Sequence, residues 1–262
     1  MTLGSGGEKK TMINNPLGFI AVLSLLTAAP AAAAPASAQA WDGVWSPIEN
    51  NMFDPSGGGE INPNLGRMHP PYKPDWEASY VKALEAAAAG KPTDPTAACV
   101  PPGMPRMMSS PYAQEMVVKD KQTLIIKEYQ SQVRRIYTDG RKPPAELDAT
   151  YNGYSTGHWE GDTLVVETIR MRGDTVYDRT AAPHSDQIKV VERMRLRSPD
   201  VWEDVLTVTD PVALTRPWVV TRTYKREPAW EILEYACAEN NRNPVDESGN
   251  NGFVANKSLK AD

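Results

Sequence analysis

Residues 187–209 read QIKVVERMRLRSPDVWEDVLTVT, and their alternation decides the fold. In the first half, one set of alternate positions holds Ile188, Val190, Glu192, Met194 and Leu196. The intervening positions hold Lys189, Val191, Arg193, Arg195 and Arg197. A period of two is that of a β-strand, and a slip of one residue would bury three arginines. We therefore predict a strand with Glu192 facing the core, followed after Ser198-Pro199-Asp200 by a second strand.

The same alternation, interrupted by turn residues, extends over most of the chain. We predict strands over 123–130, 132–138, 154–159, 163–169, 187–196, 201–209 and 218–225, with a possible last strand over 231–237. The turn Glu160-Gly161-Asp162 joins two of them as a hairpin. Short strands joined by tight turns indicate an all-β fold, an antiparallel meander closed into a barrel or a sandwich.

Different patterns precede the strands. Residues from Ser46 to Pro74 are rich in Pro, Gly and Asn, which favours a long loop. From Asp75 to Ala89 apolar residues recur at helical spacing, so we predict a helix that Asp75 caps and Gly90 ends. Its apolar face would hold Trp76, Tyr80, Ala83, Leu84 and Ala87.

The N-terminus is typical of a secretory signal. Lys9 and Lys10 precede an apolar run from Leu17 to Leu26, and Ala38-Gln39-Ala40 offers small residues for cleavage. We expect residues 1–40 to be the signal peptide, 41–242 a single barrel domain, and 243–262 a disordered tail. A membrane anchor or a buried helix is the alternative. The exported chain would be periplasmic or secreted, with no membrane span in its mature part.

Two cysteines, Cys99 and Cys237, both lie in the mature part. In an oxidising compartment a lone pair of cysteines usually bonds, so we predict a disulfide between them. Two unpaired thiols are the alternative. The formal net charge is -5, and no basic patch with interleaved aromatic residues occurs, so nucleic acid is not an expected partner.

Several short motifs carry a resemblance. The stretch Trp41-Asp42-Gly43-Val44-Trp45 before a meander resembles the Gly-x-Trp first strand of a lipocalin-like (calycin) barrel. Four further stretches begin at Cys99 (CVPPGMP), Gln132 (QVRRIY), Gly157 (GHWEGDTLVVE) and Glu234 (EYAC). Together they resemble a large group of uncharacterised secreted bacterial proteins, over about Pro74 to Asn241. The resemblance implies a compartment and a shared fold, and it transfers no activity.

Strand alternation also predicts charged side chains inside the barrel. Lys127 should face solvent, which turns Ile126 and Glu128 inward. On the later strands Trp202, Asp204, Leu206 and Val208 share one face, and Trp218, Val220, Arg222 and Tyr224 share another. The inward charges would then be Glu128, Glu192, Asp204 and Arg222, which Arg134 or Arg135 could join. Buried charges must pair or meet water, so they form either a structural network or the polar floor of a cavity.

Motifs for catalysis and metals are weak. Gly153-Tyr154-Ser155-Thr156-Gly157 fits a nucleophile elbow, but a hairpin follows where that motif needs a helix. His69, His158 and His184 lack zinc-site spacing, so we expect no metal and no cofactor. Met104, Met107 and Met108 could bind Cu(I), although such methionines more often fill apolar gaps. His184 could act as an acid or base at the barrel mouth, but we favour an exposed loop histidine that caps a turn.

Three functional hypotheses follow. The preferred one is an exported lipocalin-like protein that binds a small, largely apolar or amphipathic molecule in a cavity with a polar floor. The ligand-binding residues would be Glu128, Glu192, Trp202, Asp204, Trp218, Arg222 and Tyr224. The alternative is a cofactor-independent isomerase, dehydratase or cyclase, with catalytic candidates Glu192, His184 and Arg222. The third is a structural envelope protein with a filled core.

Overall fold

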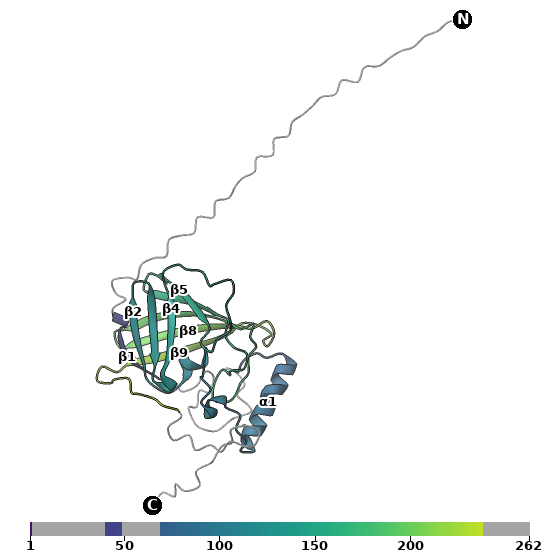
Figure 1. Cartoon of the computed structure of the whole chain (residues 1–262), viewed down its shortest axis with the longest axis horizontal. Coiled ribbons are helices and arrows are strands. Elements are labelled where there is room, and N and C mark those ends of the chain that lie inside the picture. The colour runs from purple at the N-terminus through teal and green to yellow at the C-terminus, as the bar shows by residue number, and fades with distance from the viewer. Residues whose placement is uncertain (2–39, 49–68, 238–262) are drawn as a thin grey trace, which may run out of the picture. The chain divides into compact units, whose positions relative to one another are not determined.

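A computed structural model describes Met1 and residues 40–48 and 69–237 of the chain. The predicted signal peptide, most of the predicted N-terminal loop and the predicted tail lie outside these residues. Nine strands form one closed barrel in chain order (Figure 1). They are β1 (Gly43–Pro47), β2 (Gln114–Lys119), β3 (Gln122–Lys127), β4 (Gln132–Tyr137), β5 (Tyr154–Glu160), β6 (Thr163–Ile169), β7 (Lys189–Ser198), β8 (Val201–Thr209) and β9 (Trp218–Arg226). The prediction of an all-β meander closed into a barrel is confirmed.

Neighbouring strands pair antiparallel with one exception. β4 and β5 run parallel and pair only through Ile136 with Ser155 and Tyr137 with Thr156. The connection across residues 138–153 is long enough to return the chain to the same end of the barrel. β1 closes the barrel by pairing antiparallel with both β2 and β9. The predicted last strand over 231–237 is wrong, because β1 already occupies the free edge of β9 and residues 231–236 form no strand.

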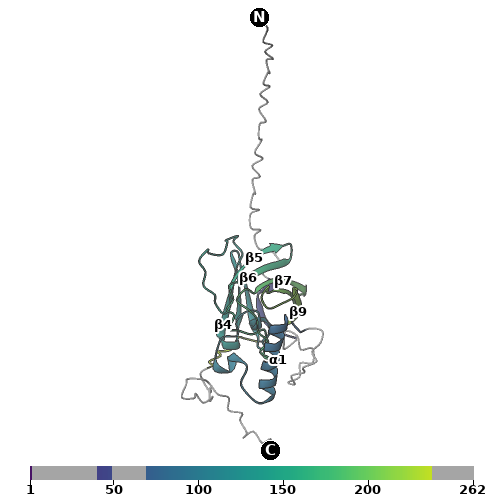
Figure 2. The same ribbon diagram turned by 90° about the vertical axis from the view of Figure 1, so that its right-hand side faces the viewer.

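One α-helix, α1 (Pro74–Ala88), lies outside the barrel wall in both Figure 1 and Figure 2. It begins one residue before the predicted start, at Pro74, whose fixed φ suits a first helical position. Asp75 therefore lies in the first turn and is not the cap, which is Lys73. Tyr80 and Leu84 are its buried residues, and the Tyr80 hydroxyl lies 3.0 Å from the Thr180 hydroxyl.

Three short 3-10 helices complete the described elements: η2 (Pro95–Ala98), η3 (Arg106–Ser109) and η4 (Tyr129–Ser131). The predicted disulfide between Cys99 and Cys237 is confirmed. It ties the segment after η2, between β1 and β2, to the chain that follows β9. None of the described helices is long and apolar enough to cross a bilayer.

Registers of the later strands follow the predicted alternation. Glu192 on β7 is buried, as are Trp202 and Asp204 on β8 and Arg222 on β9. The predicted register of β3 is wrong. Thr123, Ile125 and Lys127 face the interior, while Ile126 and Glu128 are only half-buried. Both faces of β3 carry apolar residues, so its pattern does not fix the register, and the polar layer inside the barrel accepts the lysine.

Candidate functional site

A ring of polar side chains crosses the interior of the barrel. Each strand from β2 to β9 contributes one, and we call the set the polar belt: Gln114, Lys127, Arg134, Ser155, Thr168, Glu192, Asp204 and Arg222. None of the eight is more than 2% exposed. Alternation places them inside because each shares its strand face with buried apolar residues. Five of the eight side chains are ionisable, so the belt is a charged layer inside an otherwise apolar interior.

The strongest interaction in the belt joins β4 to β7. The Arg134 guanidinium donates to both carboxylate oxygens of Glu192, with 2.8 Å between Nη1 and Oε1 and an even closer contact from Nη2 to Oε2. Arg134 also donates to the hydroxyls of Ser155, at 3.2 Å, and Thr168, at 2.8 Å. Such a two-pronged pair is geometrically well defined and holds both partners in one orientation. Glu192 is therefore neutralised by Arg134.

Asp204 lies next to this pair on β8. It stands opposite Met194 of β7 on one side and Arg222 of β9 on the other. Among the described residues, no side chain or backbone group donates a hydrogen bond to either oxygen of its carboxyl group. Burial first, and then the negative charge of Glu192, raise the pKa of Asp204 well above that of an ordinary aspartate. Asp204 thus keeps a proton that it can donate to the neighbouring Glu192 carboxylate.

Lys127 and Gln114 form the opposite part of the belt. The Lys127 ammonium is fully buried, and its hydrogen bond to Gln114 Oε1 is long, at 3.3 Å. Burial, and then the charge of Arg222, lower the pKa of Lys127 to about 7. The amide nitrogen Nε2 of Gln114 has no hydrogen-bond partner among the described residues. This part of the belt therefore has more donors than acceptors.

Aromatic rings lie beside that donor-rich part. Trp202 stacks on Tyr224 with ring centroids 4.2 Å apart, and it meets Trp45 edge to face at 6.1 Å. The indole nitrogen of Trp202 is buried without a hydrogen-bond partner among the described residues. The Tyr224 hydroxyl donates to the Met108 carbonyl oxygen at 2.5 Å, which links β9 to η3. Aromatic rings with polar tips thus line one wall of the interior.

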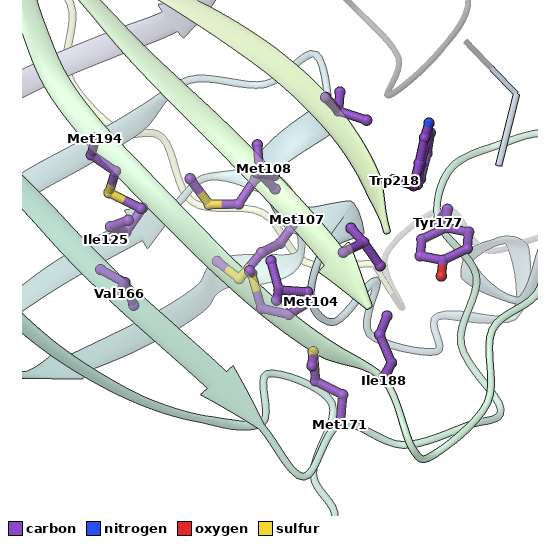
Figure 3. Close-up of a cluster of buried hydrophobic side chains, with 14 of the residues drawn as sticks. Met104, Met107, Met108, Ile125, Val166, Met171, Tyr177, Ile188, Met194 and Trp218 are labelled. Carbon is purple, nitrogen blue, oxygen red and sulfur yellow. The ribbon is translucent and has the colours of Figure 1, made fainter. Parts of the chain in front are cut away.

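Methionine side chains gather in the apolar part of the interior (Figure 3). Met104, Met107 and Met108, around η3, lie near Met171 and Met194 in that view, and all five are fully buried. Methionine side chains are flexible and adapt to irregular gaps. This cluster can therefore change shape at low cost where branched residues could not.

The wall of the barrel is closed but has a short pairing between β4 and β5. A pocket of about 450 Å³ lies there, lined by Gln132, Asn152, Tyr151 and Tyr154, among others. Arg134 and Ser155, which belong to the polar belt, also line this pocket. Arg134 and Ser155 are both almost fully buried, and Glu192 does not line the pocket, which therefore reaches only the outer side of the belt.

The structure brings together three of the predicted site residues: Glu192, Asp204 and Arg222. Trp202 and Tyr224 lie beside them. Trp218 is buried further along β9, 5.1 Å from the Tyr177 ring, and so lies away from the belt. The predicted inward position of Glu128 is wrong, because this residue follows β3, is only half-buried, and its carboxylate accepts a hydrogen bond from the Leu233 backbone.

Sequence reasoning missed Lys127, Gln114, Ser155 and Thr168, and it left Arg134 open. The alternation of Gln114 with Met116 and Val118 was the signal that could have found the first strand of the belt. Ser155 lies in a strand within the belt and hydrogen-bonds to the Thr168 hydroxyl at 2.8 Å, without a histidine partner in the described structure.

His184 is fully buried, so the favoured reading as an exposed loop histidine is wrong. Its Nδ1 lies 3.0 Å from the Ser185 carbonyl oxygen and its Nε2 lies 2.8 Å from the Thr175 hydroxyl. Burial lowers the pKa of His184, which favours a neutral ring. Both nitrogens have local partners, and the ring lies tilted against Tyr177, with centroids 5.2 Å apart, outside the polar belt. Within the described ranges, no three His, Cys, Asp or Glu residues are grouped as metal ligands would be.

Comparison with protein-family models finds no match, and comparison with curated proteins finds no significant match. Arguments about function therefore start from the barrel and its polar belt.

Proposed function

We propose that this barrel binds a small, largely apolar molecule whose polar head lies against the polar belt. One observation carries the proposal: the belt is incompletely hydrogen-bonded. The side-chain nitrogens of Gln114 and Trp202 lack partners among the described residues, although both residues are fully buried, and Asp204 accepts no hydrogen bond there. An unsatisfied buried polar group costs about 1–3 kcal/mol, so a bound molecule that supplies partners would recover part of that cost.

The surroundings of the belt suit an apolar body on that head. The methionine cluster can rearrange around a hydrocarbon group, and Trp202 and Tyr224 offer flat walls with polar tips. Entry would require the short β4–β5 pairing to part, since the pocket beside it reaches Arg134 and Ser155. The chain would act in the periplasm or outside the cell, an expectation that the disulfide supports.

Native mass spectrometry of protein purified from its own exported fraction tests this proposal. We expect a mass above that of the disulfide-bonded chain, and we expect the excess to disappear under denaturing conditions. Arg222→Met should lose the excess, whereas Arg193→Met, which removes an exposed arginine from β7, should keep it. A bare chain in the wild type, before and after incubation with an extract of small molecules, would overturn the proposal.

One observation favours a second candidate, a cofactor-independent isomerase, dehydratase or cyclase. Asp204 keeps its proton beside Glu192, so the two carboxyl groups could exchange a proton with a bound molecule. Arg222, opposite Asp204, would stabilise developing negative charge. If the copurified molecule is converted during incubation, and Glu192→Gln stops conversion while binding persists, the enzyme replaces the binding protein. Binding without conversion excludes this reaction for that molecule.

A further inference from the structure

The polar belt has an excess of positive charge. Lys127, Arg134 and Arg222 face two carboxyl groups, Glu192 and Asp204, and Asp204 keeps its proton, so the buried charges sum to +2 while Lys127 is charged. Both carboxylate oxygens of Glu192 accept hydrogen bonds from Arg134. Burying a charge without a partner costs several kcal/mol, so the arrangement leaves room for one more negative charge.

The unsatisfied groups near Lys127 are hydrogen-bond donors. The ammonium has three hydrogens and only the long contact to Gln114 Oε1, and the Gln114 amide nitrogen has no partner among the described residues. Gln114 pairs with Trp45 across β1 and β2, and Trp45 meets Trp202, whose indole N–H is also unpartnered there. Donors of this kind, gathered beside excess positive charge, call for an oxygen acceptor that is itself negative.

We propose that the head group of the bound molecule is a carboxylate, held by Lys127, Gln114 and Trp202. This inference rests on the proposed function and names the chemical class of its ligand, an amphipathic carboxylic acid. A carboxylate supplies a negative charge that offsets part of this imbalance, and it offers several lone pairs to the three donors.

The charged and titratable groups that surround Lys127 set the pH dependence. They are Arg222 on β9, Glu128 at the end of β3, and, further round the belt, Asp204, Glu192, Arg134 and Tyr224. Below pH 7 Lys127 carries its charge and the carboxylate binds at full affinity. Above pH 7 the free protein loses that proton, so affinity falls by up to about tenfold per pH unit.

Calorimetric titration of the whole exported chain, unfolded and refolded to remove bound molecules, tests the inference with four probes: dodecanoate, methyl dodecanoate, dodecanol and dodecyl phosphate. We expect dodecanoate to bind about 10- to 100-fold more tightly than the ester or the alcohol at pH 6.5, because charged hydrogen bonds form only with the acid. Tighter binding of dodecyl phosphate would overturn the carboxylate assignment. Equal binding of acid, ester and alcohol would overturn the inference while the proposed function stands. Binding by none of the four would count against the proposed function itself.

Variants locate the head group. Lys127→Met should weaken dodecanoate binding far more than dodecanol binding and so remove the preference for the acid, whereas Lys82→Met, at an exposed position on α1, should leave the preference intact. Gln114→Met should weaken the preference in the same direction if Lys127→Met does not fold. Retention of the full preference in both belt variants would place the head group elsewhere.

The pH profile of the wild type needs no variant. Dodecanoate affinity should stay flat between pH 6 and 7 and then decline, while dodecanol affinity stays constant throughout. A tenfold fall already between pH 6 and 7 would mean that the neutral acid is the bound form, which would overturn the inference. Asp204→Asn should leave the decline above pH 7 in place, because that decline belongs to Lys127. If Asp204→Asn abolishes the decline, Asp204 and not Lys127 faces the ligand.

Discussion

Removing Arg134 should destabilise the barrel more than any exposed arginine does. In Arg134→Met the Glu192 carboxylate loses both of its guanidinium donors, and the Ser155 and Thr168 hydroxyls lose theirs. Breaking one side of a buried ion pair costs about 3–5 kcal/mol, because the remaining charge stays buried. The nearby Asp204 adds to the cost, since two carboxyl groups would then share the interior without Arg134. We therefore expect a loss of about 3–5 kcal/mol in the free energy of unfolding.

The measurement is urea unfolding at pH 7 followed by circular dichroism, with the disulfide intact. Arg135→Met is the matched control, since Arg135 is the next residue on β4 and is exposed. The double variant Arg134→Met/Glu192→Leu replaces the whole pair by apolar groups and should lose less than the sum of the two single variants. A loss from Arg134→Met no larger than that from Arg135→Met would refute the account of the belt.

Three further predictions concern stability. In Asp204→Asn the amide imitates the protonated carboxyl group. Because the fold raises the pKa of Asp204, the wild type loses stability as pH rises above the ordinary aspartate pKa. Urea titrations at successive pH values should therefore show the free energy of unfolding of the variant rising relative to that of the wild type. An unchanging difference would show that Asp204 ionises normally. For Lys127 the pH dependence has the opposite sign, because its pKa of about 7 in the fold lies below its ordinary value. The wild type should therefore gain stability relative to Lys127→Met from pH 7 towards 10. A difference in unfolding free energy that does not change with pH would count against the buried ammonium. Replacing both Cys99 and Cys237 by Ala, which opens a link across 138 residues, should cost up to about 5 kcal/mol of unfolding free energy; a midpoint of thermal unfolding equal to that of the wild type would contradict a structural role for the disulfide.

Much of the fold could be predicted from the sequence because its strands have one clearly apolar face. On β7 three arginines lie on the face opposite to the apolar face that carries Glu192, so only one register is possible. The tight turn after β7 then fixes the register of β8. On β3 both faces are apolar, so only the assumption that lysine avoids the interior fixed the register, and that assumption was wrong. The parallel pairing of β4 with β5 was not predictable, since it depends on where a long connection returns the chain.

The belt was half predictable for the same reason. Glu192, Asp204 and Arg222 lie on strands with a clear alternation, so their burial followed from pattern alone. Arg134 and Arg135 are adjacent and identical, and only the tertiary structure decides which of them faces the interior. Gln114 and Lys127 enter the belt as a cross-strand pair, and such a pair cannot be recognised before the two strands are known to be neighbours.

The central claim, that the barrel holds a small molecule against its polar belt, is tested most directly by removing that molecule and returning it. Protein isolated from the cells that produce it would be unfolded in guanidinium, freed of small molecules and refolded with the disulfide intact. Its thermal unfolding would then be compared with that of the sample as isolated. We predict a lower melting temperature after removal and its recovery when the extracted small-molecule fraction is added back. A ligand at about 100 times its dissociation constant would contribute about 2.7 kcal/mol. Identical melting temperatures before removal, after removal and after addition would contradict the claim and leave the belt as a structural network in a filled core.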